Sequence, residues 1–61
     1  MNFEKTLGER ISDELESRGW TQREFSVKVG CYESDVSRWV NDSTRPQVKY
    51  RRKIKQIFGW T

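Results

Sequence analysis

The feature that most constrains the fold is a gap of about three residues between two short helical patterns, at 22–29 and about 33–41. Gly30 opens the gap, and glycine readily adopts the left-handed backbone conformation that commonly ends a helix. Two short helices with so short a connection must cross steeply, because a long antiparallel hairpin has no room to form. Ser26, four positions before Gly30, is small enough to let the helices approach. Five apolar residues surround the corner: Phe25, Val29, Cys31, Val36 and Trp39.

Two more helices are expected on either side of this pair, each followed by a glycine. An apolar residue at every fourth position predicts a helix over about 3–18; its stripe is Phe3, Leu7, Ile11 and Leu15. Pro46 suits a helix start and predicts a last helix over about 47–58, with the stripe Tyr50, Ile54, Ile57 and Phe58. No segment alternates as a strand does. We therefore expect a single all-α domain over residues 1–61, with four helices and, as an alternative at its end, a short fifth turn.

Local signals mark the starts of the two central helices. Thr21-Gln22-Arg23-Glu24 has the pattern of a capping box, in which the threonine hydroxyl and the glutamate carboxylate satisfy backbone donors at a helix start. Glu33 and Asp35 fall in the first turn of the next helix, where the positive end of the helix dipole favours negative charge. These signals predict helix starts near residues 22 and 33.

Composition argues against several classes of protein. With no histidine and one cysteine, Cys31, the chain has no imidazole base, no zinc cluster and no internal disulfide. So short a chain also has difficulty enclosing a substrate pocket. We therefore expect no enzyme, catalytic residue, metal, cofactor or small-molecule substrate, and interpret Cys31 as a small buried apolar side chain. The segment 1–5 lacks the apolar run of a signal peptide or membrane span, so a cytoplasmic protein without a membrane partner is expected.

Charge is distributed unevenly along the chain. Residues 1–20 contain five acidic and three basic side chains, a net charge of −2; since the whole chain carries +3, residues 21–61 carry +5. From Thr44 onward there is no acidic residue, and the basic ones are Arg45, Lys49, Arg51, Arg52, Lys53 and Lys55. This asymmetry indicates a polyanionic partner on the basic side, with a solvated helix surface as the alternative.

One face of the segment 33–41 is polar. At about 100° per residue, five side chains share this face: Glu33, Ser34, Ser37, Arg38 and Asn41. Val36, Trp39 and Val40 point the other way and predict the buried side. Short hydrogen-bonding side chains let a helix approach base edges in the major groove, whereas an ordinary surface helix more often carries long Glu and Lys side chains. The pattern favours reading of a DNA groove, with simple solvation as the alternative.

Arg38 is the strongest candidate for a base contact, because its guanidinium can donate two hydrogen bonds to O6 and N7 of guanine. Its alternatives are a phosphate contact or an ion pair with Asp35 or Asp42. Ser34 and Ser37 are further candidates for base contact, since a hydroxyl can donate or accept at either base; alternatively they are plain surface serines.

Two residues at the start of the same helix have a double interpretation. Glu33 can accept a hydrogen bond from the N4 amine of cytosine, or can serve the helix dipole alone. Tyr32 can contact a thymine methyl group or a phosphate, or can pack at the corner.

Phosphate contacts are expected beside this helix. The free N–H groups at the helix start near Gln22 form a binding site for phosphate. The candidate phosphate contacts are Gln22, Arg23, Asn41, Ser43, Thr44, Arg45 and Lys49.

Six short motifs lie between residues 7 and 60: Thr21-Gln22-Arg23-Glu24-Phe25-Ser26, Val29-Gly30-Cys31, Asp35-Val36-Ser37-Arg38-Trp39, Arg45-Pro46, Lys53-Ile54 and Phe58-Gly59-Trp60. Together they resemble the helix-turn-helix family of phage repressors and Cro proteins. Tyr32-Glu33-Ser34 is most similar to the Cro branch, and Ser37-Arg38-Trp39 is also similar to phage activators of the same fold. The resemblance implies a lambda-repressor-like domain whose third helix lies in the major groove, and a phosphate contact at Gln22.

Three positions depart from the family pattern. Tyr32 replaces the usual Ser or Thr helix cap, so the cap must be weaker or come from elsewhere. Val40 stands where glutamate is frequent, and Glu33 where glutamine is frequent, which leaves the base that residue 33 reads open.

The residues and the resemblance together predict a sequence-specific transcription regulator of phage or bacterial origin, a repressor or Cro-type protein that binds a palindromic operator in double-stranded DNA. The alternatives are a phage activator of the same fold, a non-specific architectural DNA binder and an antitoxin-like protein-interaction module. One short helix reads few base pairs, so a weak homodimer that forms mainly on DNA is expected. Trp60 either folds back on the core or meets a second chain.

Overall fold

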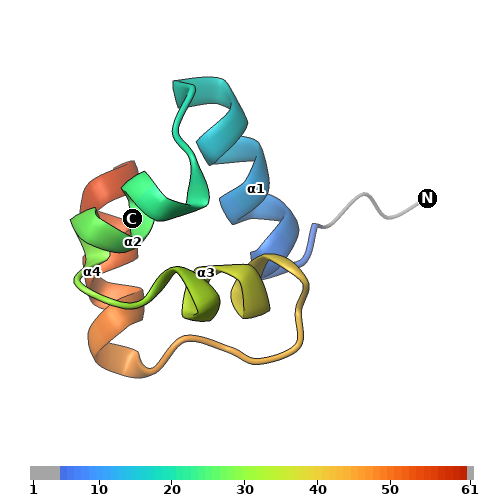
Figure 1. Ribbon diagram of the computed structural model, residues 1–61, viewed down its shortest axis with the longest axis vertical. Coiled ribbons are helices and arrows are strands. Elements are labelled where there is room, and N and C mark those ends of the chain that lie inside the picture. Colours follow the sequence, from blue (N-terminus) through green and yellow to red (C-terminus); the bar gives the residue numbers. More distant parts are fainter. Residues whose placement is uncertain (1–4, 61) are drawn as a thin grey trace.

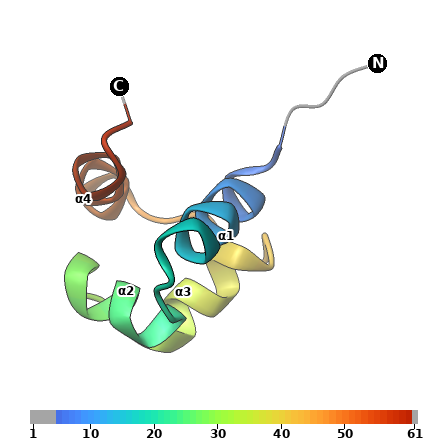
Figure 2. The same cartoon turned by 90° about the horizontal axis from the view of Figure 1, so that it is seen from above.

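The computed structural model describes residues 5–60 and, within them, four helices and no strand. The helices are α1 (Leu7–Arg18), α2 (Gln22–Val29), α3 (Glu33–Val40) and α4 (Val48–Phe58). α1 and α2 both pack against α3, and α4 packs against α2. Figure 1 shows α3 crossing below α1 and α2, and Figure 2 places the α2–α3 pair on one side of α1 and α4 on another. The all-α class is therefore confirmed, and no fifth helical turn follows α4 within the described residues.

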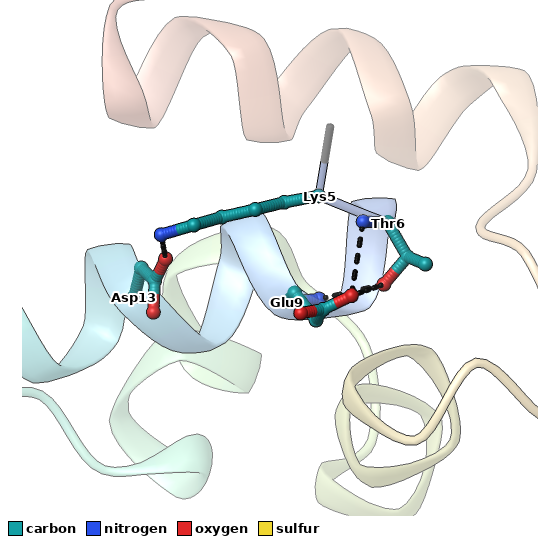
Figure 3. Close-up of polar contacts among 4 residues, drawn as sticks. All are labelled: Lys5, Thr6, Glu9 and Asp13. Atoms are coloured by element: carbon teal, nitrogen blue, oxygen red, sulfur yellow. Dashed lines mark hydrogen bonds and ion pairs between the residues drawn. The ribbon is translucent and has the colours of Figure 1, made fainter. Parts of the chain in front are cut away.

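α1 begins later than its apolar stripe predicts. The Thr6 hydroxyl accepts a hydrogen bond from the Glu9 N–H at 3.1 Å, and the Glu9 carboxylate accepts one from the Thr6 N–H at 3.2 Å (Figure 3). These reciprocal bonds satisfy two backbone donors and set the helix start at this point. The expected start near residue 3 is therefore wrong, because Lys5 and Thr6 precede the helix; Phe3 lies outside the described residues. Lys5 reaches forward and pairs with Asp13 (Figure 3).

The sharp turn between α2 and α3 matches the expectation from the sequence. Gly30 has φ +85°, in the left-handed region. The Ser26 carbonyl accepts hydrogen bonds from the N–H of Gly30 at 2.8 Å and of Cys31 at 3.0 Å. Ser26 is buried where the helices cross, and its hydroxyl donates to the Arg23 carbonyl at 2.6 Å, so the buried polar group is satisfied.

The cap of α3 comes from within the helix. The Tyr32 side chain makes no capping bond, but the Tyr32 N–H donates to the Asp35 carboxylate at 3.3 Å. Asp35 thus supplies one half of a capping box, the carboxylate that accepts from the N–H of the N-cap residue. This half needs no particular side chain at position 32. At the other end α3 stops at Val40, one residue before the expected limit, and α4 starts one residue late because Gln47 is its extended N-cap.

Among residues 5–60, eight apolar side chains form the buried core, two from each helix: Ile11, Leu15, Phe25, Val29, Val36, Trp39, Ile54 and Phe58. All eight were expected from the periodicity. Phe25 and Phe58 stack with their ring centroids 4.9 Å apart, which joins α2 to α4. The side chains that pack partly buried around this core are Leu7, Trp20, Cys31, Val40, Tyr50, Ile57 and Trp60. Within residues 5–60, none of the helices has both the length and the apolar character that crossing a membrane requires.

Trp60 takes the first of its two expected places and folds back on α1. Its Nε1–H donates to the Glu14 carboxylate at 2.7 Å, and the Arg10 guanidinium lies 4.2 Å from the centroid of its ring. Its ring also lies against Phe58, with the centroids 5.1 Å apart. The hydrogen bond from Trp60, followed by the charges of Arg18 and Arg10, lowers the pKa of Glu14 against the opposing effect of burial. Trp60, the last residue that the structure describes, is therefore held against its own chain's core.

A pH-dependent loss of stability is expected from this contact. Because the pKa of Glu14 is lowered in the fold below its ordinary value of 4.5, its contribution is present above that value and disappears as the pH falls through the lower, folded value. Trp60→Phe removes the main cause of the shift. The Tm difference between wild type and Trp60→Phe should be a few degrees near pH 7 and should be smaller at a pH well below 4.5, where the Glu14 carboxylate becomes protonated in the fold. Thermal unfolding followed by circular dichroism measures it.

The control for this prediction is Glu14→Gln, which removes the titrating group. In that background, Trp60→Phe should change the Tm by the same amount at both pH values. A difference between wild type and Trp60→Phe that does not depend on pH would mean that Trp60 contributes packing alone.

Candidate nucleic-acid interface

The polar face of α3 is turned to solvent. Glu33, Ser34 and Arg38 are exposed and Ser37 is half-buried. On the opposite side Val36 is fully buried and Trp39 is 4 % exposed, because this side covers the core. The division of α3 into a buried and an open side therefore matches the periodicity, and the open side is free of the other helices.

Arg38 makes no ion pair within residues 5–60, where the pairs are Lys5–Asp13 and Arg18–Glu14. The two carboxylates near it in sequence have other partners. Asp35 accepts from the Tyr32 N–H, and Asp42 accepts from the start of α1. The alternative in which Arg38 is held by either of them is not what the structure shows, so its guanidinium is available to an external acceptor.

Tyr32 stands at the N-terminal edge of this face and is 80 % exposed. A large side chain left this open does not pack at the corner between α2 and α3, which was one of its expected roles. Glu33 follows it in the first turn of α3, where it experiences the positive end of the helix dipole. Both groups can be reached by a ligand that approaches α3 from its open side.

The start of α2 has the geometry expected of it. The Thr21 hydroxyl accepts from the Glu24 N–H at 3.1 Å, and the Glu24 carboxylate accepts from the Thr21 N–H at 3.0 Å. The hydrogen bond that the Thr21 N–H donates to the carboxylate, followed by the effect of the Thr21 hydroxyl on the same group, lowers the pKa of Glu24. Gln22 and Arg23 occupy the first two helical positions, whose N–H groups have no acceptor inside a helix. Gln22 is half-buried and Arg23 is exposed.

The loop after α3 remains close to that helix. The Ser43 N–H donates to the Arg38 carbonyl at 2.9 Å. Thr44 and Arg45 then border a shallow pocket of about 190 Å³, completed by Asp35, Trp39, Gln47 and Tyr50. The Lys49 ammonium lies 4.9 Å from the centroid of the Tyr50 ring, and this ring in turn lies 5.6 Å from that of Trp39. The structure therefore brings the loop candidates and Lys49 next to α3.

Positive charge is uncompensated along the loop and α4. Both ion pairs in the described part of the chain involve carboxylates of α1, whereas the six basic side chains between residues 45 and 55 are all exposed. Four of these six, Arg51, Arg52, Lys53 and Lys55, lie further along α4, on an element that Figure 2 places apart from α3. These four side chains therefore add to the positive electrostatic field around the molecule and do not extend the binding surface of α3.

No family model matches the chain, and no curated protein and no solved structure does either.

Other candidate sites are weak. Between residues 5 and 60 no three side chains of the metal-binding types come together. Cys31 is half-buried, and burial, followed by the charge of Asp35, raises the pKa of its thiol, so thiolate chemistry is disfavoured. A second pocket, of about 330 Å³, lies over α1 beside Trp60. Its carboxylates at positions 13 and 14 are already engaged, by Lys5 and by Trp60 with Arg18.

Two residues that build this region were missed in the sequence. Gly8 is buried in the first turn of α1, and Asp42, considered from the sequence as an ion-pair partner of Arg38, has φ +59° and binds the start of that helix. A glycine inside a helix costs about 1 kcal/mol relative to alanine, so Gly8 was a signal that something approaches closely. Aspartate tolerates the left-handed conformation better than most residues, which was a weaker signal at position 42.

Proposed function

We propose that this protein is a sequence-specific regulator of transcription, a phage or bacterial repressor, that places α3 in the major groove of a palindromic operator. The observation that carries the proposal is the open side of α3, where Arg38 has no ion-pair partner in the described chain and Ser34 and Glu33 are exposed beside it. A face of short polar side chains with one free guanidinium suits hydrogen bonding to base edges.

The surroundings of α3 support the same proposal. The start of α2, with the N–H groups of Gln22 and Arg23, and the loop with Arg45 provide candidate phosphate contacts near the helix. Phosphate contacts of this kind fix the position of a reading helix in the groove. The proposal includes a weak homodimer on DNA, because one short helix reads few base pairs. Because Trp60 is bonded to Glu14 of its own chain, we assign the dimer contact to other residues.

Arg38→Ala tests the base contact. It should weaken binding to the specific site by about 1–3 kcal/mol and affect non-specific DNA much less, because the lost hydrogen bonds are those that recognise a base. Arg45→Ala should lower the affinity for all sequences alike and reduce the salt slope by about one unit. The specific site is first obtained by selecting bound duplexes from a random library, and titrations at several salt concentrations then compare the variants.

Arg52→Ala is the matched control, since Arg52 is an exposed arginine on α4 and should change both affinities little. Equal losses on specific and non-specific DNA would make Arg38 a phosphate anchor. A selected motif with two-fold symmetry and half-sites about one helical turn apart would support dimeric reading.

A second candidate function is non-specific architectural DNA binding, favoured by the six exposed basic side chains at 45–55. The ratio of specific to non-specific affinity separates the two, because a basic surface alone discriminates little between sequences. A library selection that yields no motif, together with tight binding at low salt, would favour this second function.

A further inference from the structure

Asp42, in the loop after α3, caps the start of α1. Its carboxylate accepts hydrogen bonds from the Gly8 N–H at 3.1 Å and from the Thr6 hydroxyl at 2.7 Å. Gly8 is the second residue of α1, so its amide has no acceptor within its own helix. A residue 34 positions away in the sequence therefore satisfies it.

The backbone around Asp42 lies directly against α1. A Cβ atom on Gly8 would be 2.4 Å from the Trp39 carbonyl oxygen and 2.7 Å from that of Val40, which places the last turn of α3 in contact with the first turn of α1. The Asp42 N–H donates to the same Trp39 carbonyl at 3.1 Å. Asp42 is also the residue at which the chain turns through the left-handed region and leaves the helix direction. The contact with α1 therefore fixes the position of Asp42, from which residues 43–45 continue.

The carboxylate of Asp42 is directed toward the positive end of the α1 dipole. A carboxylate in a loop beside a phosphate backbone would be repelled by the phosphates, and its bonds to the start of α1 direct that charge to a favourable site within the protein. We propose that Asp42 is a positioning residue for DNA binding: by holding the loop against α1, it directs Ser43, Thr44 and Arg45 toward the phosphates. This inference rests on the proposed function.

Two substitutions separate the hydrogen bonds of Asp42 from its charge and its backbone conformation. Asp42→Gly keeps the left-handed turn and removes both bonds. Asp42→Asn tolerates the same conformation, and its amide can accept from the Gly8 N–H and donate to the Thr6 hydroxyl. Both substitutions remove one negative charge.

The two variants should differ in DNA binding. We expect Asp42→Gly to bind all sequences about tenfold more weakly, with a salt slope reduced by about one unit, since one phosphate contact is lost. Asp42→Asn should bind at least as tightly as wild type. If Asp42 were only a nearby negative charge, both variants would bind DNA more tightly and by similar factors. That result would overturn the inference. Titrations are made at a temperature at which circular dichroism shows each variant to be folded.

A measurement without DNA keeps this inference distinct from the proposed function. In Asp42→Gly the Gly8 amide should exchange with solvent faster, and the backbone order parameters of residues 43–45 should fall; Asp42→Asn should resemble wild type in both. If wild type binds no DNA, the proposed function fails while these data still decide whether Asp42 holds the loop. Unchanged exchange and order in Asp42→Gly would reject the inference whatever the DNA titrations show.

Discussion

Replacing Gly8 with alanine is expected to destabilise the protein by about 3 kcal/mol, the upper range for overpacking. Helix propensity alone gives the opposite sign, since alanine is favoured over glycine in a helix by about 1 kcal/mol. The structure reverses this preference because the new methyl group would be 2.4 Å from the Trp39 carbonyl and 2.8 Å from the Asp42 carboxylate. The nearest of these neighbours is backbone, which cannot rotate away, so α1 and α3 must separate. Urea unfolding followed by circular dichroism measures the change.

Gly19→Ala is the control for Gly8→Ala, because Gly19 is needed for its backbone conformation and Gly8 for its close contact with α3. Gly19 has φ +68° and no atom within 4 Å of a Cβ built on it, so alanine there should cost only the conformational penalty of about 1–2 kcal/mol. A Gly8→Ala variant as stable as wild type, or more stable, would show that α1 and α3 do not approach as closely as described.

Phe25→Ala is expected to destabilise the protein by about 3–5 kcal/mol, close to the whole stability of a small domain. Phe25 is fully buried, and its ring stacks on Phe58 at 4.9 Å, so the substitution leaves a cavity between α2 and α4. A small core has few other side chains to fill that space. We expect most of the helical signal to be lost at 37 °C, and DNA binding to be lost with it.

Val27→Ala provides the matched control on the same helix. Val27 is 75 % exposed, and shortening it should change the free energy of unfolding by no more than about 0.5 kcal/mol. Equal effects of the two substitutions would mean that the side of α2 assigned to the core is wrong.

Local patterns in the sequence were sufficient for most of the helices and the core. The capping pair of Thr21 and Glu24, the glycine at position 30 and the apolar spacing act within a few residues, so their consequences can be derived without knowing the rest of the chain. The same holds for the open side of α3, since a helix with one apolar side must turn its polar side outward. The apolar spacing predicts too early a start for α1, because the capping pair of Thr6 and Glu9 begins the helix at Leu7.

Contacts between distant segments become visible once the helices are packed together. An all-α chain with a steep corner at Gly30 and a polar face beginning at Glu33 follows from local patterns alone. The bond between Asp42 and Gly8, and the bond between Trp60 and Glu14 across 46 positions, do not follow from such patterns. Such contacts follow from how the helices are placed by the shared core, and an aspartate or a tryptophan has many partners compatible with its local sequence. Their formation depends on the packing of the whole domain, which no short stretch of residues specifies.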